Sequence, residues 1–343
     1  MPFDPTDPTR FPSWDDLLLT HPDYCFFHTS AWARVLHESY GYRPLYFTDT
    51  TKGQLKILVP MMEVRSLITG KRGVSLPFTD MCPIIVPDTR TFDDIFDLAR
   101  EHGKKSGWKY IEFRGAEAHL RNEPASSTYY THELDLGEAP DRVLARFRNS
   151  TKRNIKKAIK QGVVAELSSS LESVREFYHL NCITRRRHGL PPQPFRFFRE
   201  LHEHVLSKGK GFVCLGRYGG RPIAGVIFLI LGQKAVYKYG ASDMKYQQLR
   251  ANNLVMWEAI KGCIEKGCNR LNLGRTEPGN DGLLQFKRGW GSQERPMKYY
   301  RYDLREDRFV EHGGPFKESY NIVKRMPLWL LSFAGSLFYK HVA

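Results

Sequence analysis

The sequence lacks the short motifs that mark several large enzyme classes. It has no Gly-x-Ser-x-Gly elbow, no Walker loop and no dinucleotide-binding glycine pattern. No cysteine or serine lies in a context that would activate it as a nucleophile, which favours direct transfer between two bound substrates over covalent catalysis. The six cysteines are scattered, without a Cys-x-x-Cys pair or a histidine cluster at zinc spacing. We therefore expect buried thiols in a reducing compartment and no metal site.

Signals for export and membrane insertion are also missing. The first five residues are acidic and rich in proline, unlike a signal peptide, and we expect a cytoplasmic protein. The apolar run 326–339 has fourteen residues, fewer than the roughly 20 that cross a bilayer. Lys324, Arg325 and Lys340 flank this run. Two interpretations follow: a terminal helix docked on the body of the protein, which we favour, or a helix peripheral to the inner membrane face.

Acidic residues are scarce in the second half of the chain. Residues 1–137 carry a net charge of −4, whereas residues 138–343 contain 37 Lys and Arg against 18 Asp and Glu, a net charge of +19. Such asymmetry indicates that the second half meets an anionic partner, which is a nucleic acid, a phosphorylated metabolite or an anionic membrane surface. The alternative is a solvated basic surface without a partner.

Helices and strands alternate along both halves, which predicts an α/β fold of two related domains. In the first half, Gly107 ends a helix expected over 91–106, and a strand follows over 108–114. In the second half we expect a helix over 139–161, strands over 163–167, 223–231 and 235–239, and a helix over 252–266. These elements place a first domain at 1–138 and a second at 139–311. A C-terminal helical segment at 312–343 then packs on the body or on a membrane surface.

Two basic clusters lie in the second half. The run from Arg142 to Lys160 contains eight Lys and Arg and no acid. Like charges at i,i+4 destabilise a helix, so their presence favours phosphate or tRNA contacts, although a solvated helix face is the alternative for each residue. The candidates are Arg148, Lys152, Arg153, Lys156 and Lys157. The second cluster, Arg185 to Arg187, exceeds what a helix dipole needs, and its forked guanidinium groups match phosphate or carboxylate geometry.

Four stretches of the second half follow one another in a distinctive order. They are Arg153-Asn154-Ile155-Lys156-Lys157-Ala158 followed by Gly162, Tyr239-Gly240-Ala241-Ser242, Leu273-Gly274-Arg275, and Phe286-Lys287-Arg288-Gly289-Trp290-Gly291. This succession resembles the Fem family, the bacterial non-ribosomal aminoacyl and peptidyl transferases, over most of the chain and most strongly over 142–303. The resemblance implies two tandem domains similar to GCN5-related acetyltransferases (GNAT), with mixed, largely antiparallel sheets flanked by helices.

The resemblance also implies an activity: an acyl group moves from an activated donor to an amine. Family members use aminoacyl-tRNA and extend the peptide of a cell-wall precursor. By the same resemblance, Lys287 stabilises charge on the donor ester or its leaving hydroxyl, and Phe286 shapes the pocket. The alternative is a buried Phe286 and a solvated Lys287, but the glycines on both sides of Trp290 favour a constrained turn. The further substrate-binding candidates are Tyr239, Arg185, Arg186, Arg187, Arg275 and Asn252, with the phosphate-binding member of the three arginines left open.

The donor stays open as well. Acetyl-CoA enzymes of the GNAT type hold the pyrophosphate on a glycine-containing loop before a helix, but the corresponding stretch 247–252 contains no glycine. We therefore favour aminoacyl-tRNA over acyl-CoA or an acidic acyl carrier protein, with no tightly bound cofactor and a phosphorylated cell-envelope precursor as acceptor. The coiled-coil arm of some tRNA-using family members is absent. A hypothesis of another class is a non-catalytic protein that binds RNA or anionic lipid through 142–160 and the C-terminal helix.

Overall fold

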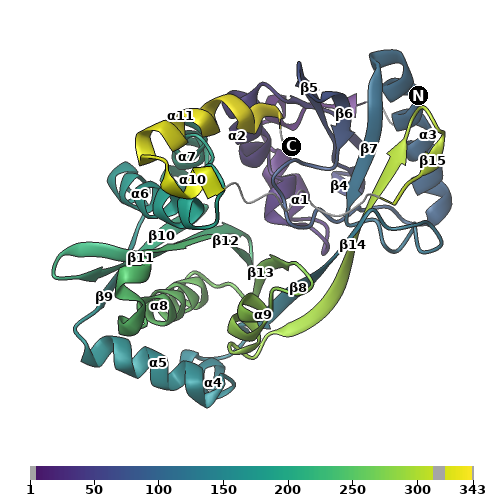
Figure 1. Ribbon diagram of the computed structural model, residues 1–343. Helices are drawn as coiled ribbons and strands as arrows, with labels where there is room; N and C mark the ends of the chain where they lie inside the picture. Colours follow the sequence, from purple (N-terminus) through teal and green to yellow (C-terminus); the bar gives the residue numbers. More distant parts are fainter. Residues whose placement is uncertain (1–4, 312–320, 342–343) are drawn as a thin grey trace. The chain divides into compact units, whose positions relative to one another are not determined.

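The computed structural model describes residues 5–311 and 321–341, so Met1–Asp4 and the part 312–320 of the expected C-terminal segment lie outside the described residues. The chain forms two compact units, each with its own helices and strands (Figure 1). Unit 1 comprises 1–129, 296–317 and 338–343, and unit 2 comprises 130–295 and 318–337. None of the helices in the described ranges combines the length and the hydropathy that a membrane-spanning segment needs.

Unit 1 packs helix α3 (Thr89–Ser106) against a mixed sheet. The Asp88 carboxylate caps the start of α3, and Gly107, with φ 70°, ends it in a left-handed conformation. Phe92, Ile95 and Ala99 form the apolar face of α3 and are buried in the same core as β7. The sheet order is β2 (Arg43–Pro44), β5 (Met62–Ser66), β6 (Gly70–Val74), β7 (Trp108–Arg114) and β14 (Gln293–Asp303), with β6 and β7 parallel and β15 (Arg308–Phe309) paired to β14.

The remaining elements of unit 1 form a smaller layer. A second sheet has the order β1 (Pro5–Thr6), β3 (Tyr46–Thr51) and β4 (Gln54–Val59). Helix α2 (Ser30–Tyr40) begins after Thr29, whose hydroxyl accepts a hydrogen bond from the Trp32 amide, and ends at Gly41. The short helices are η1 (Pro8–Arg10), α1 (Trp14–Leu18), η2 (Phe26–His28) and η5 (Tyr339–His341).

Unit 2 contains a mostly antiparallel sheet. Its order is β8 (Ser127–Asp135), β13 (Arg270–Thr276), β12 (Lys234–Ser242), β11 (Arg221–Leu231), β10 (Gly211–Tyr218) and β9 (Val164–Ser168). Strands β12 and β13 are parallel, and their ladder ends at Val236 and Asn272, although both strands continue. The two strands are therefore not paired with each other over their carboxyl-terminal halves.

Helices cover both faces of this sheet (Figure 1). Gly216 of β10 faces Val255 of α8 (Ala251–Glu265), whereas Gly225 of β11 faces Phe177 of α6 (Leu171–Arg187). Because Gly216 pairs with Ala224, the neighbour of Gly225, α8 and α6 lie on opposite faces. The other helices are α4 (Pro140–Ala145), α5 (Asn149–Lys160), α7 (Phe195–His204), η3 (Leu206–Lys208), η4 (Met244–Leu249), α9 (Asp281–Arg288), α10 (Asn321–Arg325) and α11 (Leu328–Phe338).

Most predicted elements are confirmed within a few residues, and one is wrong. The single helix expected over 139–161 is two helices, α4 and α5, interrupted at 146–148. The interruption has a tertiary cause: the Arg148 amide donates to the Gly289 carbonyl oxygen at 3.0 Å instead of continuing a helix. The predicted domain boundaries lie at 138/139 and 311/312. In the structure, the chain passes from unit 1 to unit 2 at 129/130 and returns to unit 1 at 295/296.

Candidate functional site

A cavity of about 480 Å³ lies in unit 2, between the starts of helices α5 and α8 and one side of α9. Its wall is mainly polar, with hydroxyl and amide groups from four segments of the chain. Two arginines, Arg148 and Arg250, and one carboxylate, Asp243, line it. The lining residues are Arg148, Ser150, Thr151, Asn154, Ile223, Ala224, Ser242, Asp243, Met244, Tyr246, Gln247, Arg250, Ala251, Asn252, Asn253, Gly282, Gln285, Phe286 and Gly289. This surface is suited to a polar, anionic ligand.

The loop before α8 forms one wall of the cavity without the expected glycine. Arg250, which precedes the first residue of α8, has φ 58°, a left-handed conformation that glycine adopts more easily. Ala251, Asn252 and Asn253 at the start of α8 line the cavity, where the first amides of a helix lack partners in the helix. The Arg250 backbone thus adopts, without a glycine, the left-handed conformation that precedes α8 on the cavity wall.

The stretch from Phe286 to Gly291 lies where the end of α9 packs against the start of α5. Phe286 lines the cavity, and the Trp290 ring is fully buried between the rings of Phe147 and Phe286, at centroid distances of 5.0 and 5.7 Å. The Gly289 carbonyl oxygen accepts hydrogen bonds from the Thr151 hydroxyl and from the backbone amide of Arg148, the residue just before α5, both at 3.0 Å. Gly291 has φ 71°. These contacts hold the end of α9 against the start of α5.

Lys287 lies on another side of α9 and does not line the cavity. It is 2% exposed, and its Nζ donates to the carbonyl oxygens of Gly274 and Arg275 at 2.8 and 2.9 Å. These carbonyls belong to the part of β13 beyond its ladder with β12, where the register to β8 is irregular between Asn272 and Arg275. The ammonium is thus a buried cation oriented by a strand end, and the solvated alternative for Lys287 is wrong.

His132 of β8 is a buried histidine near Lys287 that the sequence analysis did not single out. Its side chain is fully buried, neither ring nitrogen has a hydrogen-bond partner among the residues that the structure describes, and Nδ1 lies 3.7 Å from a Glu294 carboxylate oxygen. Burial, reinforced by the charge of nearby Lys287, lowers the pKa of His132 to about 4. A single histidine in a strand has no motif around it, so no sequence signal marks this position.

The other predicted substrate-binding residues lie outside the cavity, apart from Asn252. The Asn252 side chain donates to the Ser242 hydroxyl at 3.3 Å on the cavity wall. The Tyr239 hydroxyl donates to the Gln193 side chain at 2.7 Å, and the Arg275 carbonyl oxygen holds Lys287. In the last turn of α6, Arg185 donates to the Pro191 carbonyl oxygen, Arg186 is partly buried, and Arg187 lies 3.0 Å from the His188 ring nitrogen.

The basic residues of α5 divide into two groups. Arg148, at the start of the helix, lines the cavity, and Lys152 donates to the Ala145 carbonyl oxygen. Arg153, Lys156 and Lys157 are exposed on the helix surface. Ile155 and Ala158 are buried and turn the opposite face of α5 toward the core. The helix therefore combines one cationic group in the cavity with a cationic outer face.

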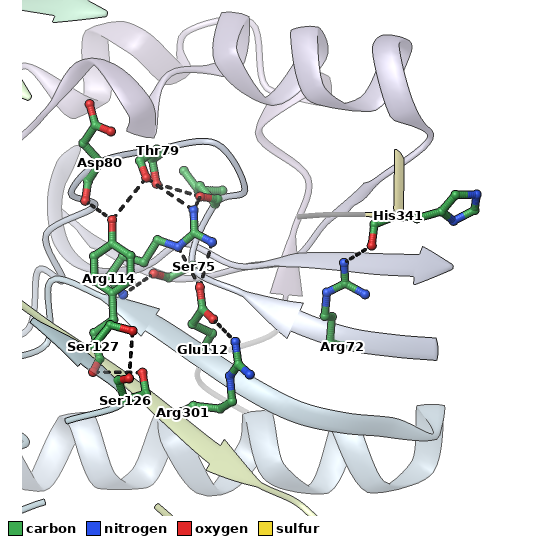
Figure 2. Close-up of polar contacts among 12 residues, drawn as sticks. Arg72, Ser75, Thr79, Asp80, Glu112, Arg114, Ser126, Ser127, Arg301 and His341 are labelled. Atoms are coloured by element: carbon green, nitrogen blue, oxygen red, sulfur yellow. Dashed lines mark hydrogen bonds and ion pairs between the residues drawn. The ribbon is translucent and has the colours of Figure 1, made fainter. Parts of the chain in front are cut away.

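Unit 1 has its own buried charge cluster (Figure 2). Glu112 accepts hydrogen bonds from Arg114 and Arg301, each at 2.8 Å. Burial alone raises the pKa of Glu112, but the two guanidinium groups hold it at about 2. Arg114 also donates to the carbonyl oxygens of Leu76 and Thr79, and thereby fixes the 76–80 loop. This cluster has a structural explanation within unit 1.

Two cysteines that are distant in the sequence meet in unit 1. The ligand atoms of Cys25, His28 and Cys82 lie within 4.8 Å of one another. Both His28 ring nitrogens are hydrogen-bonded to the backbone, one to the Pro83 carbonyl oxygen at 2.9 Å and one to the Cys25 amide at 3.2 Å. The imidazole is thus already used in fixing the loop, and the group is accounted for as packing.

Comparisons with known proteins identify a domain family and related proteins. Residues 145–288 match the family model described as an acetyltransferase (GNAT) domain. The chain is 25% identical over 158 residues to the UDP-N-acetylmuramoylpentapeptide-lysine N(6)-alanyltransferase of Weissella viridescens, a match that covers 45% of this chain and 46% of that protein. The chain therefore spans about half the length of this curated relative.

Two solved structures share the fold. FemX has a TM-score of 0.69 at 15% identity, over 85% of this chain and 95% of that chain. A tandem GNAT protein from the clavulanic acid biosynthesis pathway has a TM-score of 0.57 at 10% identity, over 88% of this chain and 98% of that chain. These similarities confirm the predicted fold of tandem GNAT-like domains with mixed sheets and flanking helices. The chain therefore has the GNAT fold and is similar in structure to FemX and, over part of its length, in sequence to the Weissella alanyltransferase.

Proposed function

We propose that this chain is an N-acyltransferase that moves an aminoacyl group from aminoacyl-tRNA to an amine of a phosphorylated cell-envelope precursor. The name of the Weissella relative describes alanyl transfer to a lysine of a UDP-linked muramoyl pentapeptide. The observation that carries the proposal is the buried ammonium of Lys287, held where the β12–β13 ladder has ended, next to the cavity-lining Phe286.

The proposed reaction needs charge stabilisation more than it needs a nucleophile on the protein. The acceptor amine attacks the ester carbonyl of the donor and forms a C–N bond, and the carbonyl oxygen becomes negative. The C–O bond to the tRNA ribose then breaks, and the ribose hydroxyl leaves with the proton that the amine loses. A cation fixed in a buried site stabilises the negative oxygen without reorganising, because the backbone has already oriented it. Lys287 has this role in the proposal.

Replacing Lys287 with Met tests the role directly. Methionine keeps the approximate side-chain length and removes the charge, so single-turnover transfer is expected to fall by at least about 100-fold. The matched control is Lys266→Met, which removes an exposed lysine at the end of α8. Circular dichroism of both variants confirms that they are folded. Transfer by a folded Lys287→Met protein at the wild-type rate would contradict the proposal.

The donor needs a separate experiment, since the start of α8 on the cavity wall also suits the pyrophosphate of an acyl-CoA. Isothermal titration compares aminoacyl-tRNA, acyl-CoA and an acyl carrier protein, with Arg148→Gln as the variant. We expect aminoacyl-tRNA to bind most tightly and Arg148→Gln to weaken that binding by about tenfold. Tighter binding of acyl-CoA would move the enzyme to the acyl-CoA class.

The proposal includes a location. An acceptor attached to a growing envelope is met at the inner membrane face, so a peripheral contact through residues 324–340 belongs to the same hypothesis. Residues of this segment lie on α10 and α11.

A further inference from the structure

Helix α11 has one face that is fixed to unit 2. Leu331 is fully buried, and a side chain added at Gly335 would collide with the Pro192 carbonyl oxygen. The Ser332 hydroxyl lies 3.6 Å from the Cys182 sulfur of α6. These contacts pack this face of α11 on unit 2 and fix the rotation of α11 about its own axis.

The opposite face of α11 is apolar and exposed. Trp329, Phe333 and Leu337 are 73%, 59% and 48% exposed, at a spacing of i, i+4 and i+8. At 3.6 residues per turn these three side chains share one stripe, which lies about 180° around the helix from Leu331 and Gly335. A continuous row of large apolar side chains in water is costly, and such patches mark interaction sites.

The charge around this stripe has one sign. Lys324 and Arg325, both exposed, end the short helix that precedes α11, and residues 321–341 contain no aspartate or glutamate. Apolar side chains beside basic residues are the combination that binds the surface of an anionic bilayer, where aromatic rings enter the headgroup region and cations meet lipid phosphates.

A second copy of the chain and an orientation of α11 across the bilayer both fit the stripe less well. The exposed parts of Trp329, Phe333 and Leu337 amount to roughly 400 Å², about half of what each partner contributes to a stable dimer. The eleven residues of α11 extend about 16 Å, which is short of the roughly 30 Å of a bilayer core, so the helix lies along the surface and does not cross it.

We infer that the Trp329–Phe333–Leu337 stripe of α11, together with Lys324 and Arg325, is a docking surface for an anionic lipid bilayer. Leu331 and Gly335 hold the helix to unit 2 while the stripe enters the headgroup region. This inference deepens the location given in the proposed function, and its test is separate from the transfer reaction, because lipid binding is measured without donor or acceptor.

The test is co-sedimentation of the full chain with vesicles. Phosphatidylcholine vesicles and vesicles of phosphatidylcholine with phosphatidylglycerol are compared. We expect the wild-type protein to bind the anionic vesicles at least tenfold more strongly. Phe333→Ser and Leu337→Ser are each expected to weaken this binding by about tenfold or more. Lys324→Gln and Arg325→Gln each weaken binding to anionic vesicles by about fivefold and leave binding to neutral vesicles unchanged.

The matched control is Val164→Ser on edge strand β9, whose side chain is 58% exposed, close to that of Phe333. It removes a similar exposed apolar group and is expected to bind vesicles as the wild type does. Vesicle binding unchanged in Phe333→Ser and Leu337→Ser would overturn the inference. So would a concentration-dependent dimer, seen by analytical ultracentrifugation, that Phe333→Ser abolishes, since the stripe would then be an interface between two copies.

Discussion

Phe286 and Lys287 are neighbours in sequence but have different environments. Resemblance to the Fem family identified both as site residues, but it did not distinguish the cavity wall from the buried strand end. That distinction depends on α9, a helix of eight residues that the sequence analysis did not predict. The burial of His132 was missed for the same reason, because it depends on what packs against its strand. Residue type is thus readable from sequence, whereas orientation requires the neighbouring elements.

His132 makes the stability of unit 2 depend on pH. Its pKa is about 4 in the folded protein and about 6.5 in an unfolded chain, so the unfolded state binds more protons between these values. The unfolding free energy should therefore fall as pH decreases from 6.5 to 4, by about 2 kcal/mol from this residue after allowance for solvent screening. Urea unfolding across this range measures the effect.

The variant His132→Phe isolates that contribution. Phenylalanine fills a similar volume without a titrating group, and it removes two buried nitrogens that lack hydrogen-bond partners. We expect the difference in unfolding free energy between variant and wild type to grow in favour of the variant as the pH falls. Parallel pH profiles for the two proteins would show that His132 does not control the acid response.

At the scale of elements, local signals predicted what local interactions determine. Asp88 and Gly107 mark the ends of α3, and both act as caps in the structure. The failure at 139–161 has the opposite cause, since α4 and α5 separate where the Arg148 amide meets Gly289, more than a hundred residues away. Likewise, Leu76 and Phe78 adopt positive φ values of 57° and 58° in a loop that the distant Arg114 side chain fixes. No local propensity encodes these contacts.

The junction of α9 and α5 should be sensitive to Gly291. Its φ of 71° is left-handed, and an added Cβ would lie 3.0 Å from the Arg146 carbonyl oxygen. Gly291→Ala is therefore expected to lower the unfolding free energy by about 1–2 kcal/mol. Gly282 is the control, because it lies within helix α9 with no atom within 4 Å of an added Cβ. Gly282→Ala should raise stability by up to about 1 kcal/mol. Equal effects of the two substitutions in thermal unfolding would contradict this account.

At the scale of the whole molecule, the sequence analysis divides the chain into consecutive domains, whereas the chain of the structure comes back to unit 1 after passing through unit 2. Residues 296–317 and 338–343 follow unit 2 in sequence but belong to unit 1, where the Arg72 guanidinium donates to the His341 carbonyl oxygen at 3.0 Å. Composition along the chain cannot show such a return, because it records neighbours in sequence and not in space. The charge asymmetry, by contrast, was visible in composition, and it leads to a prediction about the donor.

Binding of aminoacyl-tRNA should depend steeply on salt, because a partner held by surface cations releases counterions when it binds. Lys156 and Lys157 are exposed on α5, in the half of the chain with a net charge of +19. The double variant Lys156→Gln/Lys157→Gln should weaken binding and lower the slope of log affinity against log salt by about one to two. The control is Lys261→Gln on α8, whose ammonium already pairs with Glu258 at 2.8 Å. Fluorescence anisotropy at several salt concentrations gives the slopes. If the double variant keeps both the wild-type slope and wild-type affinity, α5 does not hold the donor, and the excess charge of this half has another role.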